Sequence, residues 1–125
     1  MDQAEFHRTA ISKDPNNRIF AIQESSEVFH NFLDKSEAEN DLLQLAKDKV
    51  PEVRIIAAQT ISGAFGVMPN KSRAEKYLLK LAKDKDADVR TETAQAIGFA
   101  CASIQDIYRY EYIFVWCIGL YKIPS

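Results

Sequence analysis

The sequence predicts an all-α fold, an α-solenoid built from stacked antiparallel helix pairs, and three observations lead to it. The stretch LLQLAKDKVPEVR at residues 42–54 returns as LLKLAKDKDADVR at residues 78–90, which is 36 positions later. A weaker copy precedes the first by the same interval. In each clear copy, apolar residues fall at helical spacing in two short segments joined by a polar turn. A short helix pair buries its apolar face only against neighbouring copies, so the repetition predicts a stack.

The repeat also predicts the domain organisation. Aligning residues 38–66 with residues 74–102 gives 15 identities in 29 positions. The weaker copy shares eight residues with its successor, namely Lys13, Pro15, Arg18, Ile19, Ala21, Gln23, Ser26 and Phe29. We expect one domain over residues 1–125, with a degenerate unit at about 1–35, clear units at 36–71 and 72–107, and an apolar C-terminal element at 108–125.

The first helix of each clear unit carries a possible start signal. Ser36 and Ser72 lie three residues before Glu39 and Glu75, the spacing of a capping box. In that motif the hydroxyl accepts from an amide of the first turn and the Glu carboxylate reaches back to the cap. The apolar stripe of the first helix is predicted to be Ala38, Leu42, Leu45 and Ala46.

The second helix of the unit is expected to begin near Pro51, because proline suits a first helical turn, whose N–H groups have no partner within the helix. Its predicted apolar stripe is Val53, Ile56, Ala57, Ile61, Ala64 and Phe65. The equivalent stripe of the next unit is Val89, Thr93, Ile97, Ala100 and Cys101. The glycine and proline of GVMPNKS then end the helix.

These residues resemble a known family, the HEAT repeats, and most closely the short prokaryotic type called bilin-lyase-like. The resemblance is carried by Leu42, Leu43, Leu45, Asp48, Val53, Arg54, Ala57, Ala58 and Ile61, and by Leu78, Leu79, Leu81, Asp84, Val89, Arg90, Ala94 and Ile97. It covers residues 36–103 well and 12–30 weakly. It implies a right-handed superhelix of about three HEAT-like repeats.

The resemblance also implies a structural ladder across the repeats, formed by an aspartate between the helices and an arginine six residues later. The matching residues are Asp48, Arg54, Asp84 and Arg90. The first copy departs from the pattern, because it keeps Arg18 but has Ser12 in place of the aspartate and Asn17 in place of the valine. A row of basic ligand-binding residues is the alternative reading of the three arginines.

Composition and charge exclude several function classes. A net charge of −2 gives no long-range attraction to polyanions, so nucleic acids and anionic membranes are not expected partners. The most apolar stretch, YIFVWCIGLY, is too short to cross a bilayer, which needs about 20 residues. No signal peptide is visible. Cys101 and Cys117 are expected to be small buried hydrophobes in a reducing compartment, so the predicted localisation is cytoplasmic.

No catalytic site, cofactor site or metal site is predicted. His7 and His30 lack nearby Cys or His companions at the spacing that zinc needs. The acidic residues sit at expected caps, turns and solvent-facing positions, and no phosphate-binding loop or nucleophile–histidine set is visible. The chain is therefore expected to be a non-enzyme.

A glutamine row suggests a surface for a protein partner. Gln23, Gln59 and Gln95 recur at 36-residue intervals on the polar side of the second helices, which line the concave surface in HEAT arrays. The candidate protein-binding residues are Glu52, Ile55, Gln59, Asp88, Thr91 and Gln95. The function expected is a non-enzymatic scaffold that binds a protein or peptide. The alternatives are a merely solvated helix face, an accessory protein that handles a bilin or other tetrapyrrole, and a nucleic-acid-binding module.

The C-terminal element breaks the repeat. Its aromatic residues alternate with a period of two, which favours a strand, whereas the repeat register favours a helix. Its apolar area exceeds what one repeat is expected to cover. We therefore expect either self-association or contact with further repeats of a longer parent chain, through Tyr110, Tyr112, Phe114, Trp116 and Ile118.

Overall fold

The computed structural model describes residues 2–28 and 34–102, and every regular element in these ranges is helical. The all-α prediction is confirmed. The elements are α1 (Gln3–Ala10), α2 (Pro15–Val28), α3 (Lys35–Leu45), α4 (Pro51–Gly63), the 3₁₀ helix η2 (Phe65–Val67), α5 (Lys71–Leu81) and α6 (Ala87–Ala102).

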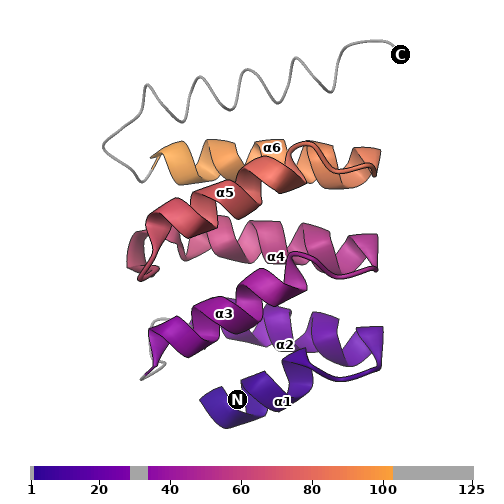
Figure 1. The fold of residues 1–125 in the computed structure, drawn as a ribbon, viewed down its shortest axis with the longest axis vertical. Coiled ribbons are helices and arrows are strands. Elements are labelled where there is room, and N and C mark those ends of the chain that lie inside the picture. The colour runs from indigo at the N-terminus through magenta and orange to yellow at the C-terminus, as the bar shows by residue number, and fades with distance from the viewer. Residues whose placement is uncertain (1, 29–33, 103–125) are drawn as a thin grey trace.

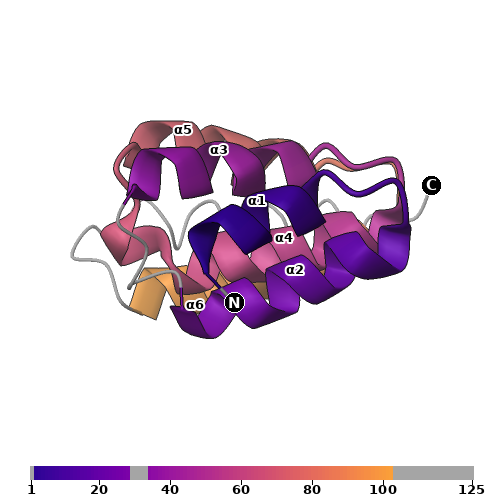
Figure 2. The same cartoon turned by 90° about the horizontal axis from the view of Figure 1, so that it is seen from below.

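The helices form a two-layered stack (Figure 1). The first helices of the pairs, α1, α3 and α5, lie in one layer, and the second helices, α2, α4 and α6, lie in the other (Figure 2). Helix α4 packs against both α2 and α6, and the second helices are in closer contact with one another than the first helices are. The starts of α2, α4 and α6, at Pro15, Pro51 and Ala87, are 36 positions apart.

The hydrophobic core runs between the two layers and through all three pairs. The predicted stripe of α3 is buried, and so are Val53, Ala57, Ile61, Ala64 and Phe65 in the next helix and turn. Ile56 is only partly buried. In α6, Val89, Thr93 and Ile97 are buried as predicted.

The predicted capping boxes are wrong. Helix α3 begins at Lys35 with Asp34 as its cap, and the Asp34 side chain accepts a hydrogen bond from the Glu37 amide. Helix α5 begins at Lys71, and Asn70 caps it in the same way. Each helix therefore starts before Ser36 or Ser72. The physical reason is that Asp and Asn bind free first-turn amides at least as well as Ser does.

The two glutamates of the supposed capping boxes are buried at 3 % and 8 % exposure. Glu39 does not reach back to its own cap. Its Oε1 accepts from the amide of Asn70, the cap of the next unit, at 3.1 Å. Gln3 makes the same contact with the Asp34 amide one unit earlier. This column of side chains ties successive units together rather than closing a single helix.

The arginine–aspartate ladder joins neighbouring units. Arg54 donates from Nε and Nη2 to the two carboxylate oxygens of Asp84, both at 2.9 Å, and from Nη1 to the Asp48 carbonyl at 2.8 Å. Arg18 holds Asp48 in the same bidentate way and also donates to the Ser12 carbonyl. The missing aspartate at Ser12 thus leaves this rung intact, because the turn contributes only its backbone.

The third arginine, Arg90, keeps the hydrogen bonds to turn carbonyls but lacks the pairing with a carboxylate within the described residues. Arg90 donates to the carbonyls of Asp84 and Lys85, and it pairs with no carboxylate in residues 34–102. The position 36 residues after Asp84 holds Leu120, which has no carboxylate to offer. Because Arg18 and Arg54 each reach forward to the aspartate of the following unit, the ladder has a direction.

Ionisation follows this geometry. Burial opposes charge on Asp84, yet hydrogen bonds from Arg54 and from the Asp86 amide hold the pKa of its carboxyl below the usual 3.8. The hydrogen bond to Asp48 raises the pKa of Arg18 further above its ordinary value, against the effect of burial. In both Asp84 and Arg18, the ladder contact therefore favours the charged form of a side chain that is largely shielded from water.

Several predictions fall outside the described residues. They are those on His30, on Cys117 and on the C-terminal element with its aromatic residues, and those on the side chains of Ala100 and Cys101. In the described ranges, no helix is long and apolar enough to cross a membrane.

Candidate interaction surface

The exposed sides of α2, α4 and α6 form what we call the second-helix face. Of the six residues predicted to bind a partner, Glu52, Gln59, Asp88 and Gln95 are exposed. The other two, Ile55 and Thr91, are partly buried.

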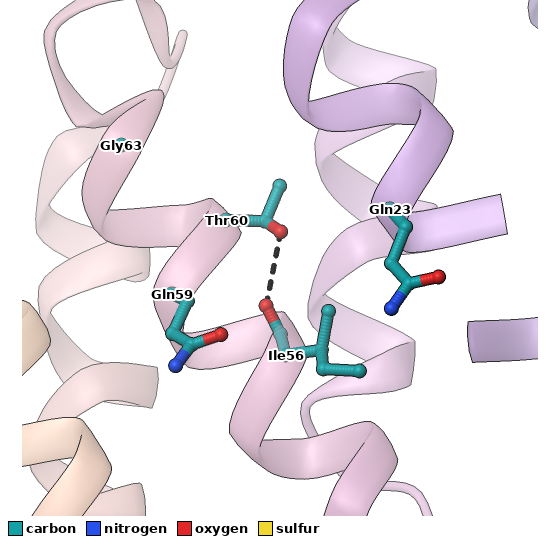
Figure 3. A pocket seen from close by; sticks show the side chains of 5 residues that line it. All are labelled: Gln23, Ile56, Gln59, Thr60 and Gly63. Carbon is teal, nitrogen blue, oxygen red and sulfur yellow. Dashed lines mark hydrogen bonds between the residues drawn. The ribbon is translucent and has the colours of Figure 1, made fainter. Parts of the chain in front are cut away.

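Two hollows open on this face, one on each side of Gln59. The first has a volume of about 320 Å³ and lies between α2 and α4, lined by Gln23, Ile56, Gln59, Thr60 and Gly63 (Figure 3). The second has a volume of about 420 Å³ and lies between α4 and α6, lined by Gln59, Ser62, Gly63, Glu92, Gln95 and Ala96.

The structure brings together only part of the predicted set. The three glutamines line the hollows, with Gln59 shared by both. The other four predicted residues lie nearer the starts of α4 and α6 and line neither hollow.

Sequence reasoning missed the residues at the C-terminal half of this face. The signal was present, because the stripe that contains Glu52, Ile55 and Gln59 continues at helical spacing to Ser62 and Gly63. A small residue at position 63 hollows the surface. A Cβ atom built on Gly63 would meet nothing within 4 Å.

The polar side chains around the hollows differ in how they are satisfied. Thr60 Oγ1 donates to the Ile56 carbonyl at 2.9 Å, within its own helix (Figure 3). Gln59 Nε2 donates to Glu92 Oε2 at 3.3 Å, which is a long hydrogen bond across the second hollow. The Ser62 hydroxyl is buried and has no hydrogen-bond partner in the described part of the chain.

The second-helix face is acidic. Exposed or partly exposed carboxylates on it are Glu24, Glu52, Asp88 and Glu92. Among the described side chains of α2, α4 and α6, the cations are the three ladder arginines. Two of these are paired with the partly buried aspartates Asp48 and Asp84, and Arg90 donates to turn carbonyls. A ligand that meets this face therefore meets net negative charge.

Comparison with known families identifies the architecture. A model of HEAT repeats matches residues 8–98, most of the chain. The chain belongs to the HEAT repeat family. No curated protein and no solved structure gives a significant match. HEAT repeats are commonly protein-interaction scaffolds and are generally not enzymes. The bilin-lyase-like subtype stays a prediction.

A second polar cluster lies between the first helices of the first two HEAT units. His7 on α1 places Nδ1 2.9 Å from both carboxylate oxygens of Asp41 on α3 and 4.0 Å from Glu37 Oε1. The hydrogen bond to Asp41 and the charge of that residue raise the pKa of His7 above 6.5, against a small effect of burial. The sequence search missed this cluster because the companions of His7 are 30 and 34 positions away.

Proposed function

We propose that the protein is a non-enzymatic scaffold whose second-helix face binds an extended, basic peptide segment of a partner protein. The observation that carries the proposal is the column Gln23, Gln59 and Gln95, which runs across three consecutive HEAT units between acidic residues.

The glutamine column suits a peptide backbone. A glutamine amide offers both a donor and an acceptor, the two groups that a peptide unit needs. Packed helices lie about 8–10 Å apart, and an extended chain advances about 3.3 Å per residue. Three residues of an extended peptide therefore match one step of the column.

The hollows and the charge suit the side chains of such a peptide. Hollows of about 320 and 420 Å³ on either side of Gln59 can receive small or medium side chains. The surrounding carboxylates favour lysine or arginine on the peptide and disfavour nucleic acid. The closer contact among the second helices supports their placement on the inner side of the stack.

Defined peptides test this proposal by fluorescence anisotropy. A labelled, extended lysine-containing peptide should bind in a salt-sensitive way, and an acidic peptide of the same length should not. Charge reversal by Glu52→Lys together with Asp88→Lys should weaken binding by roughly tenfold, because each rim charge contributes up to about 1 kcal/mol. Circular dichroism should show unchanged helix content.

A matched control lies on the other layer. Lys76 on α5 is exposed, and Lys76→Glu should leave peptide binding unchanged. If Lys76→Glu weakened binding and the two reversals on α4 and α6 did not, the surface would be the first-helix layer. Retention of DNA or RNA without peptide binding would reject the proposal.

Gly63 provides a steric test of the same surface. Gly63→Ala adds a methyl group where nothing lies within 4 Å, whereas Gly63→Phe places a ring between the two hollows. The phenylalanine variant should lose peptide binding and the alanine variant should keep most of it. Equal binding by both variants would place the peptide away from the hollows.

A further inference from the structure

We propose that His7, Glu37 and Asp41 form a binding site for a divalent transition-metal ion such as Zn²⁺, which clamps α1 onto α3. These residues place one donor atom each within 4.8 Å of the others. The site is independent of the second-helix face.

The geometry is close to what such an ion needs. Donor atoms around a tetrahedral Zn²⁺ lie about 3.3 Å apart, because Zn–N and Zn–O bonds are about 2.0–2.1 Å long. The Nδ1 atom of His7 lies 2.9 Å from Asp41 and 4.0 Å from Glu37, values on either side of that spacing. The side chain of Glu37 is 49 % exposed, so it can move inward without disturbing the core.

Burial gives the ion a reason to bind. The side chain of Asp41 is only 10 % exposed, and a buried carboxylate is stabilised by positive charge, which a cation bound between Asp41 and His7 would supply. Its carboxylate faces the half-exposed ring of His7, so the open side of the cluster is the side from which an ion and its remaining water ligands can enter. One nitrogen and two carboxylates favour zinc or a similar ion over Mg²⁺ or Ca²⁺, which prefer oxygen ligands alone.

The repeat shows that this set is not a general feature of the fold. The equivalent positions between the second and third HEAT units hold Leu43, Arg73 and Tyr77, which offer no set of metal ligands. Position 7 is therefore a histidine where the next unit has a fully buried leucine. All three positions therefore hold side chains that can bind a metal at the interface of the first two units, and they hold no such set at the next interface.

Zinc titration of the full chain tests the site. Isothermal titration calorimetry on metal-free protein should give one Zn²⁺ per chain, and Zn²⁺ should raise the midpoint of thermal unfolding, whereas Mg²⁺ should not. His7→Gln keeps a donor for Asp41 but removes the nitrogen ligand, and should weaken Zn²⁺ binding by at least about tenfold. Glu37→Gln should weaken it as well.

Glu5→Gln is the matched control, because Glu5 is an exposed acid on α1 that lies outside the cluster. This variant should bind Zn²⁺ like the wild type, and circular dichroism should show that all variants keep their helix content. Absence of Zn²⁺ binding would overturn the proposal. Binding that survives His7→Gln unchanged would also overturn it and would assign the ion to other groups, with Cys101 and Cys117 the first to test.

Discussion

At the scale of single residues, the ladder contact is a charged pair held almost out of water. The side chains of Arg54 and Asp84 are 7 % and 12 % exposed. Such a pair differs from a surface salt bridge, since losing one partner leaves the other charge buried. A rung is therefore expected to stabilise the fold only when both of its charged partners are present.

A double-mutant cycle measures how much the pair of Arg54 and Asp84 contributes to the free energy of unfolding. Arg54→Met should lower the free energy of unfolding by about 3–5 kcal/mol, because it strands the Asp84 carboxylate and the Asp48 carbonyl. Adding Asp84→Leu should restore most of the loss. Urea denaturation followed by circular dichroism gives both values.

Arg90 is the matched control for this cycle. It binds carbonyls but no carboxylate in the described ranges, so Arg90→Met should cost only about 1–3 kcal/mol. A loss at Arg90 equal to that at Arg54 would mean that the turn carbonyls, not the ion pair, dominate the rung.

At the scale of helices, the caps decide where each unit begins. Asn70→Ala should lower the free energy of unfolding by about 0.5–2 kcal/mol, because the Arg73 amide loses its acceptor. Ser72→Ala should be neutral or slightly stabilising, since Ser72 is an exposed residue inside the first turn. Thermal unfolding of both variants gives the comparison. A larger loss of stability for Ser72→Ala than for Asn70→Ala would identify Ser72 as the cap.

The second prediction at the scale of helices concerns Gly63 at the end of α4. It is the last residue of α4, its φ is not positive, and a methyl group there meets open space. Gly63→Ala should raise the free energy of unfolding by about 0.4–1 kcal/mol, because alanine loses less backbone entropy on folding. Chemical denaturation checks the sign. A destabilised Gly63→Ala would show that α4 needs glycine at its end for another reason.

The helices and their contacts also show which features of the fold the sequence can predict. Helix content and the core residues of the second unit follow from helical periodicity, and the helix start at Pro51 follows from the preference of proline for a first helical turn. The role of Glu39 does not, because its partner is the backbone of the next unit. The cluster at His7 also escapes, since its ligands meet only once α1 and α3 stack. Contacts inside a unit can be predicted from the sequence, whereas contacts between units depend on how the units pack against each other.

At the scale of the whole molecule, acid should loosen the stack. The pKa of Asp84 is lower in the folded chain than its usual 3.8. Its contribution to stability is therefore complete above the unfolded pKa and is lost as the pH falls through the folded one. Urea denaturation at a series of pH values should show a steeper loss below about pH 4 for the wild type than for Arg54→Met/Asp84→Leu. Parallel curves for the two would contradict the assignment.

The forward direction of the ladder has a consequence for how such chains change length. Each internal unit carries an arginine for the unit after it and an aspartate for the unit before it, as Arg54 and Asp48 show. A copied unit of 36 residues inserted beside its original would thus find both halves of each new junction already encoded. Growth by duplication therefore needs no compensating substitution at the ladder, so one more unit can be added without leaving a new junction short of its arginine or its aspartate.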